Sequence, residues 1–247
     1  MERWVGKVAI VTGASAGIGE AFALRLANEG MIVNFGVLNV LLKNLYFFQE
    51  LCKKVTNPKG VLHAVKFDIT DVDAIPALFA DIKNRYGGVD VMVNNAATLR
   101  SEFRVCESPT KDFQDVINTN LLAMAVFSKE AISSMRERKF AGHVFNLNSV
   151  AGHKVMVADN VNLHIYYASK HGVGALNETL RLEMAILGTN IKVTGISPGL
   201  VKTEILSRGG IREVDQLPHI LSEDIADSLV WILSTPPSVF VSYFQTT

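Results

Sequence analysis

The most informative pair of side chains in the sequence is Tyr166 and Lys170. Four residues apart in a helical pattern, they lie on one face of a helix. A phenol has a pKa of about 10 in water and exchanges protons poorly at neutral pH, but a nearby ammonium group favours the phenolate and lowers that pKa. The pair predicts an acid–base group at Tyr166, although a surface Tyr–Lys pair is a frequent alternative. Tyr167 lacks such a partner, because the residue four positions later is His171.

A glycine-rich segment follows the first strand-like stretch and leads directly into the first helical pattern. Glycines in this place let the chain turn tightly and approach a pyrophosphate, which binds the free N–H groups at the start of a helix. An ordinary turn is the alternative, but the position between a strand and a helix favours a dinucleotide site. The segment reads Thr12-Gly13-Ala14-Ser15-Ala16-Gly17-Ile18-Gly19.

Polar residues also follow the later strand-like stretches, where the ligand-binding edge of a parallel sheet is expected. Each has a structural alternative: Asp68 can cap the helix that begins near Asp71, and asparagine and serine are common in turns. Asn120 falls on the apolar stripe of a long helical pattern, so it is either a structural hydrogen-bonding residue or part of a site. The strand-end residues are Asp68-Ile69, Asn94-Asn95-Ala96-Ala97, Asn148-Ser149 and Pro198-Gly199, with Thr203 shortly afterwards.

Strand and helix patterns alternate along the chain. Short, β-branched and apolar stretches predict strands covered on both faces; they are Lys7–Thr12, Met31–Phe35, Val61–Phe67, Val89–Asn94, His143–Asn148 and Asn190–Ser197. Predicted helices are Ile18–Asn28, Leu41–Val55, Asp71–Tyr86, Pro109–Arg138, Tyr166–Leu187 and Ser222–Ser234, and a final edge strand is predicted at Val239–Phe244. Such alternation implies right-handed crossovers. We therefore predict an α/β fold: a Rossmann-type doubly wound parallel sheet in three α/β/α layers, formed by a single domain over residues 1–247.

The composition is that of a globular protein and narrows the classes of partner. Of the 247 residues, 49% are hydrophobic and 19% are charged, and 24 basic residues balance 24 acidic ones. This balance and the lack of a long basic run argue against nucleic acid as a partner. Cys52 and Cys106 are too few for a disulfide framework and show no metal-ligand spacing, so we expect no metal. We expect neither a secretion leader nor a membrane span, and hence a cytoplasmic protein.

Taken together, these residues resemble the short-chain dehydrogenase/reductase family in its compact single-domain form. The resemblance runs from about Val5 to about Pro237 and rests on several motifs in the family's order. They are the glycine segment 12–19, Asn94-Asn95-Ala96, and the Y-x-x-x-K element from Tyr166 to Lys170. Gly30-Met31 and Ser234-Thr235-Pro236-Pro237 resemble an animal subgroup, many of them insect proteins, that acts on farnesol-like alcohols and on 3- or 17-ketosteroids.

The resemblance implies a role for each candidate residue. Tyr166 would be the general acid–base, Ser149 would polarise the carbonyl group, and Lys170 would bind the nicotinamide ribose and lower the pKa of the tyrosine. Asn120 would hold a proton-relay water, and Asp68 would contact adenine. Thr203 would contact the nicotinamide carboxamide. The full set of remaining cofactor contacts is Gly13, Ser15, Ala16, Gly17, Ile18, Gly19, Asn39, Ile69, Asn95, Ala96, Ala97, Pro198, Gly199, Val201 and Thr203.

Three departures from the family pattern bear on these expectations. Ala97 replaces the usual glycine and adds one methyl group beside the nicotinamide. The second predicted strand ends in Gly36-Val37-Leu38-Asn39, where the subgroup has arginines for a 2′-phosphate and NAD-specific members have a carboxylate. The resemblance favours NADP(H) and leaves NAD(H) as an alternative. The tail from Ser242 is abbreviated, which questions the closing edge of the sheet.

The sequence therefore predicts an oxidoreductase that interconverts a lipophilic secondary or allylic alcohol, of farnesol, retinoid or steroid type, and its carbonyl compound. A homodimer or homotetramer is the family's habit. The alternative is a catalytically weak dinucleotide-binding or interaction protein that retains the fold, against which the intact Ser149, Tyr166 and Lys170 argue. Apolar residues in two loops favour a small lipophilic substrate; these are Val155, Met156, Val157, Val161, Leu163, Ile205, Leu206, Ile211 and Leu217.

Overall fold

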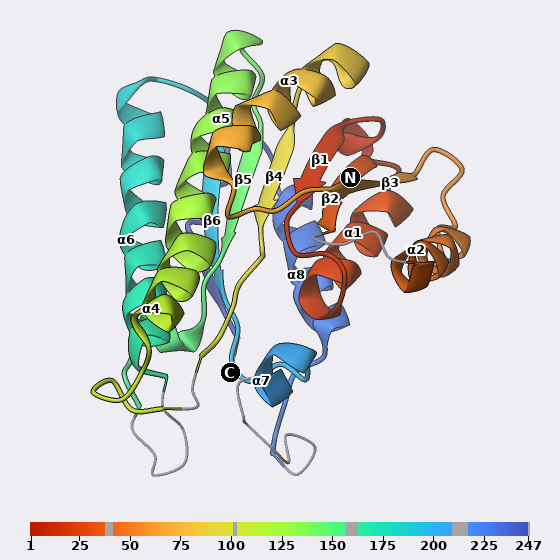
Figure 1. Cartoon of the computed structure of the whole chain (residues 1–247). Helices are drawn as coiled ribbons and strands as arrows, with labels where there is room; N and C mark the ends of the chain where they lie inside the picture. Colours follow the sequence, from red (N-terminus) through yellow and green to blue (C-terminus); the bar gives the residue numbers. More distant parts are fainter. Residues whose placement is uncertain (38–41, 101–102, 157–162, 209–216, 247) are drawn as a thin grey trace.

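The strands form one seven-stranded sheet in which every neighbouring pair is parallel. The computed structural model describes residues 1–37, 42–100, 103–156, 163–208 and 217–246, and its strand order is β3-β2-β1-β4-β5-β6-β7 (Figure 1). The direction of winding reverses between β1 and β4, which is where doubly wound sheets bind their ligands. The strands are β1 (Val8–Val11), β2 (Ile32–Val37), β3 (Val61–Lys66), β4 (Val91–Asn94), β5 (His143–Leu147), β6 (Lys192–Ser197) and β7 (Tyr243–Gln245).

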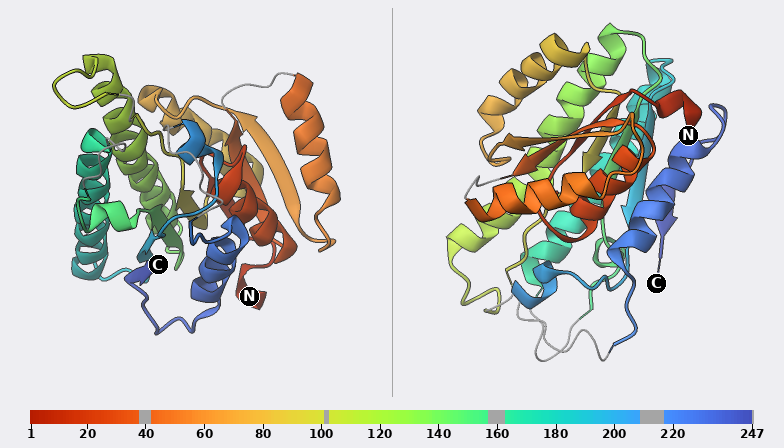
Figure 2. Two further views of the ribbon diagram at one scale, coloured as in Figure 1. Left: turned by 90° about the horizontal axis from the view of Figure 1, so that it is seen from below. Right: turned by 90° about the vertical axis from the view of Figure 1, so that its right-hand side faces the viewer.

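Helices cover both faces of the sheet, as the two further views show (Figure 2). One core lies under α1, α2 and α8, and the other lies under α3, α5 and α6. The predicted three-layer Rossmann-type arrangement is confirmed. The helices are α1 (Gly17–Asn28), α2 (Leu42–Lys53), α3 (Ile75–Tyr86), α4 (Thr110–Ile117), α5 (Ala123–Glu137), α6 (His164–Ile186), α7 (Glu204–Arg208) and α8 (Ser222–Ser234).

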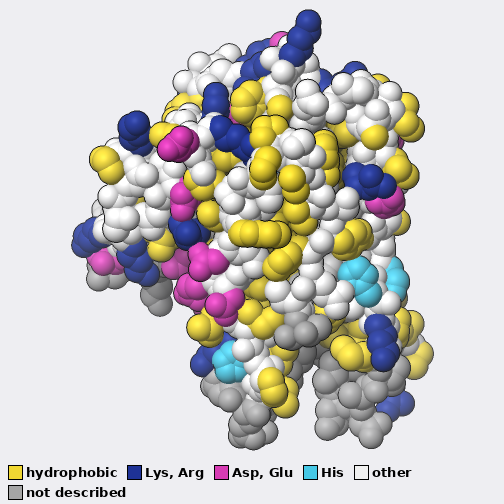
Figure 3. Space-filling model, turned by 180° about the vertical axis from the view of Figure 1, so that it is seen from behind, with side chains coloured by type: hydrophobic (Ala, Val, Ile, Leu, Met, Phe, Trp, Pro, Cys, Tyr) yellow, Lys and Arg dark blue, Asp and Glu magenta, His cyan; other side chains and the backbone are white. Residues whose placement is uncertain are grey.

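Exposed hydrophobic side chains run down the middle of the face that α8 covers (Figure 3). On α8 and the C-terminal segment, Trp231 is 56% exposed and Phe240 is 58% exposed, and Val239 and Tyr243 are exposed as well. Large apolar side chains in water are a feature of surfaces that contact a partner. Among the described residues, no helix combines the length and the apolar character that crossing a bilayer requires.

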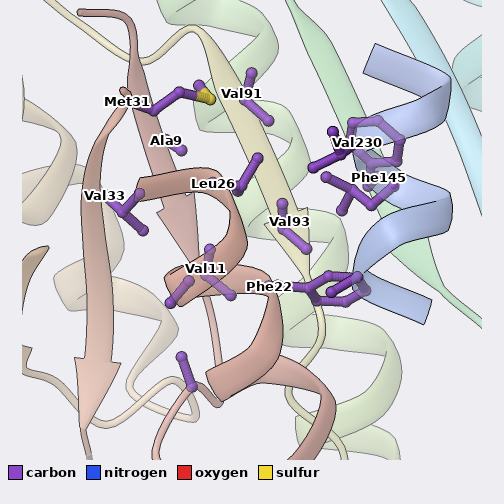
Figure 4. Packing of buried hydrophobic residues seen from close by; sticks show 14 of the residues in the cluster. Ala9, Val11, Phe22, Leu26, Met31, Val33, Val91, Val93, Phe145 and Val230 are labelled. Atoms are coloured by element: carbon purple, nitrogen blue, oxygen red, sulfur yellow. The ribbon is translucent and has the colours of Figure 1, made fainter. Parts of the chain in front are cut away.

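The central strand β1 is apolar at all four positions because both of its faces are covered. In β1, Ala9 and Val11 point into the core under α1 and α8, whereas Val8 and Ile10 point into the core under α3 and α5. Figure 4 shows Val11 of β1 and Phe22 of α1 among the side chains of the first of these cores. This packing fixes the strands, and with them the loops at their carboxyl ends.

The structure corrects two predicted helices and adds one. The predicted helix Pro109–Arg138 is divided, because a π-helical turn at Asn118–Leu122 separates α4 from α5. The predicted helix Asp71–Tyr86 begins with a short 3₁₀ turn at Val72–Ala74 before α3. The sequence did not predict α7, whose five residues are too short for a periodic pattern to be recognised.

The edge strand is also shorter than predicted. The stretch before β7 is bound by side chains of β6, since Lys192 Nζ donates to the carbonyl groups of Pro236 (3.0 Å) and Val239 (2.5 Å). Strand pairing therefore begins only at Tyr243, opposite Gly195. The C-terminal segment nevertheless forms a parallel closing strand.

Candidate active site

The carboxyl ends of the strands surround a cleft of about 750 Å³. Its walls come from the loops after β1, β4, β5 and β6 and from the first turns of α6. A cleft of this size accommodates a small molecule. The predicted site residues that line it are Gly13, Ser15, Ala16, Gly17, Ile18, Gly19, Asn95, Ala96, Ala97, Ser149, Tyr166, Lys170, Pro198, Gly199, Val201 and Thr203.

The glycine loop after β1 lies so close to its surroundings that side chains are excluded from it. A β-carbon on Gly13 would lie 2.7 Å from the α-carbon of Ala96, and Gly13 has a φ of +65°. A β-carbon on Gly19 would lie 2.3 Å from the carbonyl oxygen of Gly13. Both positions therefore require glycine. The motif is explained by backbone packing as well as by access for a ligand.

Thr12 and Asn95 hold this loop against the loop after β4. The Asn95 amide donates to the carbonyl groups of Thr12 (2.8 Å) and Gly13 (3.0 Å). In return, the Thr12 hydroxyl accepts from the N–H groups of Asn95 and Ala96, both at 3.1 Å. The side chain of Asn95 thus shapes the cleft from behind, as expected of a residue in a tight backbone arrangement.

Ser149, Tyr166 and Lys170 come together on the floor of the cleft. The Ser149 hydroxyl is hydrogen-bonded to the phenol oxygen of Tyr166 and accepts from the N–H of Ala151 at 3.1 Å. Lys170 is 1% exposed, and its Nζ donates to the carbonyl of Leu147 at 2.7 Å. The same Nζ lies 5.6 Å from the centre of the Tyr166 ring. The helical spacing of the pair therefore brings both side chains to one site, as predicted.

The pKa of Tyr166 moves in the direction opposite to our expectation. Burial raises it to about 12, and the hydrogen bond from Ser149 only partly opposes this effect. Burial also lowers the pKa of Lys170 to about 7, so the ammonium group itself is disfavoured at its site. Burial is the largest cause of the shift at Tyr166, and Lys170 is not among its causes, so the lowering of the tyrosine pKa by the lysine stays a prediction.

Asn120 lies in the π-helical turn with its side chain completely buried. Its Oδ1 accepts from the N–H of Thr98 at 2.7 Å, and its Nδ2 donates to the carbonyl of Thr98 at 3.0 Å and to Ser169 Oγ at 3.1 Å. Both ends of the amide have protein partners. Of the two alternatives, the structural one accounts for these contacts: the side chain ties the loop after β4 to α6.

A line of buried polar side chains crosses the molecule beneath the site. Asn94 Nδ2 donates to Ser128 Oγ and to Asn146 Oδ1, both at 2.9 Å, and Asn146 Nδ2 donates to Asn177 Oδ1 at 3.0 Å. All four residues are at most 2% exposed. The line joins α5, β4, β5 and α6, and therefore sets the position of the elements that carry the reacting groups.

Two predicted cofactor residues, Asp68 and Ile69, do not line the cleft. Asp68 is exposed, and its Oδ1 accepts from the N–H (2.9 Å) and the hydroxyl (2.7 Å) of Thr70, which makes it a turn residue. Ile69 packs against the core under α3 and α5. Asn39 lies outside the described residues.

The other wall of the cleft contains residues that the sequence analysis missed. Of the predicted loop residues, Met156, Leu163, Ile205 and Leu206 line the cleft, whereas Val155 and Leu217 are exposed and positions 157, 161 and 211 lie outside the described residues. For Thr98, Leu99 and Arg100, the available signal was their position directly after Ala97. For Tyr167 there was none, since its partner is set by the fold. The missed residues are Thr98, Leu99, Arg100, Leu147, Val150, Ala151, Tyr167, Leu200 and Glu204.

Comparison with known proteins assigns this arrangement to a family. The family described as short chain dehydrogenase matches residues 7–211 of the sequence. The chain belongs to the short chain dehydrogenase family. This dehydrogenase is 41% identical to farnesol dehydrogenase of Aedes aegypti, over 98% of this chain and 95% of the relative. It is 35% identical to dehydrogenase/reductase SDR family member 11 of Mus musculus, over 99% of this chain and 95% of the relative.

The same family relationship holds for solved structures. Actinorhodin polyketide ketoreductase with NADPH superposes with a TM-score of 0.83 at 27% identity, over 98% of this chain and 95% of that one. The dehydrogenase is accordingly an oxidoreductase of the alcohol dehydrogenase type that binds a nicotinamide dinucleotide.

The residues of the glycine loop fit the pyrophosphate of such a cofactor. α1 begins at Gly17, and its N-cap residue Ala16 offers no side-chain hydrogen bond to the first turn. The N–H groups at a helix start need partners, and an anion is a favourable one. The close approach at Gly13 and Gly19 keeps side chains away from this position. In the described part of the chain, no three His, Cys, Asp or Glu residues are grouped so that they could hold a metal ion.

Gly19→Ala should destabilise the dehydrogenase and weaken cofactor binding. The added methyl group would lie 2.4 Å from Asn95 Nδ2 as well as against Gly13, so the two loops must separate. Overpacking of this kind costs about 1–3 kcal/mol in the free energy of unfolding. Gly36→Ala is the control, because its β-carbon would meet no atom within 4 Å. Urea unfolding and fluorescence titration with NADPH measure both effects; equal stability of the two variants contradicts the packing argument.

Lys170→Met should change how stability depends on pH. The pKa of Lys170 is about 7 in the folded protein, against 10.5 for a lysine in the unfolded chain. Between these two values the unfolded chain holds a proton that the folded protein has lost. Below pH about 7 the buried lysine is charged, and the full cost of burying the ammonium lowers the free energy of unfolding. This cost disappears as the pH rises toward 10.5, where the lysine is neutral in both states. The stability of Lys170→Met relative to wild type should therefore fall as the pH rises from 7 to 10. Parallel unfolding free energies across this range would contradict it.

Proposed function

We propose that the dehydrogenase interconverts a lipophilic secondary or allylic alcohol and its carbonyl compound, with Tyr166 as general acid–base. The observation that carries this proposal is the hydrogen bond between Ser149 and Tyr166 above the buried Lys170, in a cleft whose other end is the glycine loop. A dinucleotide bound at the loop and a substrate oxygen at the two hydroxyl groups would share one cleft.

The walls beyond Tyr166 support a lipophilic substrate. They are formed by Leu99 after β4, by Leu163 before α6, and by Ile205 and Leu206 of α7. Apolar side chains with a few placed polar groups are typical of sites for small lipophilic molecules. The relative named farnesol dehydrogenase supports an allylic terpenoid alcohol as the first candidate.

The side chains of the chain perform the proton transfer and position the substrate. The bound nicotinamide supplies or accepts the hydride. Tyr166 gives its proton to the substrate oxygen when the carbonyl is reduced and takes it back when the alcohol is oxidised. Ser149 donates to that oxygen and holds it beside the phenol. Lys170, anchored on the Leu147 carbonyl at 2.7 Å, would hold the ribose of the cofactor.

The pKa of Tyr166 favours one direction at neutral pH. Because burial raises this pKa to about 12, the phenol carries its proton at pH 7. A protonated phenol is the form that donates to a developing alkoxide, which is the proton transfer that carbonyl reduction requires.

NADP(H) is the proposed cofactor, with NAD(H) as the alternative. The solved ketoreductase that resembles the chain is in complex with NADPH. The segment Val37-Leu38-Asn39 contains no cation for the additional phosphate and no carboxylate for the ribose hydroxyls. We therefore propose weak discrimination between the two cofactors.

A homodimer or homotetramer is the proposed assembly. The exposed apolar side chains on the face that α8 covers, above all Trp231 and Phe240, support it (Figure 3). Burying side chains of this size against a second copy removes apolar surface from water.

Tyr166→Phe should abolish turnover and leave the fold and cofactor affinity close to wild type. The change removes one hydroxyl group and little volume, and the loss of a positioned acid–base costs on the order of a hundredfold or more in rate. Initial rates are followed by the absorbance of reduced nicotinamide, with the affinity for NADPH measured on the same samples. Turnover near the wild-type rate would favour the alternative in which another residue, or no residue, moves the proton.

Asn39→Arg should raise the affinity for NADPH and leave that for NADH unchanged. An arginine–phosphate contact is charge-assisted and about twice as strong as a neutral hydrogen bond. For wild type we expect the two affinities to differ by no more than roughly tenfold, or about 1.4 kcal/mol. Fluorescence titrations with both cofactors measure this. A wild type that prefers NADPH by about a hundredfold would mean that cations elsewhere bind the phosphate.

A further inference from the structure

Tyr167 follows the proposed acid–base in sequence and faces the same cleft. Its ring lines the cleft and is 7% exposed. Its hydroxyl donates to the main-chain carbonyl of Met156 at 2.5 Å, and its N–H donates to the carbonyl of Leu163 at 3.0 Å. Met156 and Leu163 both line the cleft as well. One residue of α6 therefore holds two parts of the substrate wall.

The two hydrogen bonds differ in what they require of the side chain. The bond to Leu163 belongs to the first turn of α6 and does not involve the phenol. The bond to Met156 connects residues 11 positions apart and depends on the phenol hydroxyl alone. The side chain of Met156 is 53% exposed, so packing contributes little to its position. Among the described residues, the hydroxyl of Tyr167 is therefore the group that anchors the main chain of Met156 in the wall.

The start of α6 is fixed by contacts other than that hydroxyl. His164 Nε2 and Ser108 Oγ are hydrogen-bonded at 3.1 Å, and Asn120 Nδ2 donates to Ser169 Oγ at 3.1 Å. These bonds bind the helix to the segment before α4 and to the π-helical turn. Removal of the hydroxyl therefore releases Met156 and leaves the reacting side chains of α6 in place.

We propose that Tyr167 is a specificity-determining residue, whose hydroxyl fixes Met156 in the cleft wall and gives long apolar substrates an ordered contact surface. This inference rests on the proposed function. A substrate short enough to touch only the reacting groups does not use this part of the wall. The Tyr167 hydroxyl therefore affects how strongly the site prefers long substrates over short ones, and it has no part in the proton transfer.

The test compares Tyr167→Phe with wild type on two alcohols that share their reacting end. Farnesol and prenol are both allylic alcohols, and prenol lacks the long apolar tail. The KM for farnesol should rise about three- to tenfold, because the loss of one neutral hydrogen bond changes an affinity by about this factor. The kcat should stay unchanged, because losing an interaction that the ground state and the transition state share raises KM alone. The kcat/KM for prenol and the Kd for NADPH should stay within about twofold.

Tyr243→Phe is the matched control. Its hydroxyl also donates to a main-chain carbonyl, that of Gly174 at 3.4 Å, and Tyr243 is not among the residues that line the described cleft. This variant should behave as wild type on both alcohols. A farnesol-to-prenol selectivity of Tyr167→Phe equal to that of wild type overturns the proposal, as does an equal change in Tyr243→Phe.

A binding measurement separates this inference from the proposed function. Farnesol and prenol are titrated calorimetrically into the NADPH complex of Tyr166→Phe, with and without Tyr167→Phe, where no turnover occurs. A selective loss of farnesol affinity in the double variant supports the inference, and unchanged affinity overturns it. A wild type that turns over neither alcohol, nor any carbonyl compound of a wider panel, counts against the proposed function alone.

Discussion

The active site depends on the hydrogen bonds that join the loop after β1 to the loop after β4. The side chains of Thr12 and Asn95 exchange hydrogen bonds with the backbone of the opposite loop, and the glycines at 13 and 19 allow the two loops to come this close. The same backbone lines the cleft. The shape of the cofactor half of the cleft is therefore set by packing within the protein and needs no ligand to form it.

In the reacting half of the site, two titratable side chains are buried where their charged forms are unfavourable. Burial shifts the pKa of Tyr166 upward and that of Lys170 downward, so both groups are pushed toward their neutral forms. The fold tolerates this because the lysine has a carbonyl partner at Leu147 and the phenol has Ser149. Unfavourable burial of this kind is common where a protein prepares groups for proton transfer, and it lowers stability in exchange.

Local patterns predicted the parts of the site that local geometry determines. The spacing of Tyr166 and Lys170 and the position of the glycine segment were sufficient, because a helix turn and a strand–helix junction fix them. Partners across the fold were not predictable: the bonds of Asn120 to Thr98 and of Tyr167 to Met156 depend on how distant segments pack.

Asp68 had two possible roles, a contact to adenine and a hydrogen bond within its own segment. The structure shows the second, because Asp68 accepts from the N–H of Thr70, two positions later. The division of the helix at the π-helical turn also escaped prediction, since the apolar spacing continues through it. The parallel sheet and the two-sided core were predictable, because alternating strand and helix patterns leave few arrangements that cover every apolar face.

The buried line from Ser128 through Asn94 and Asn146 to Asn177 constrains how the sequence can diverge. Replacing one member by an apolar residue leaves its neighbour buried without a partner, which costs more than the lost bond, whereas an apolar replacement of neighbouring members together can be nearly neutral. Natural variation at these positions should therefore be concerted. Homologues in which one amide of the line is replaced by an apolar residue should also have an apolar residue at the neighbouring position. We therefore expect the four positions to change together in evolution.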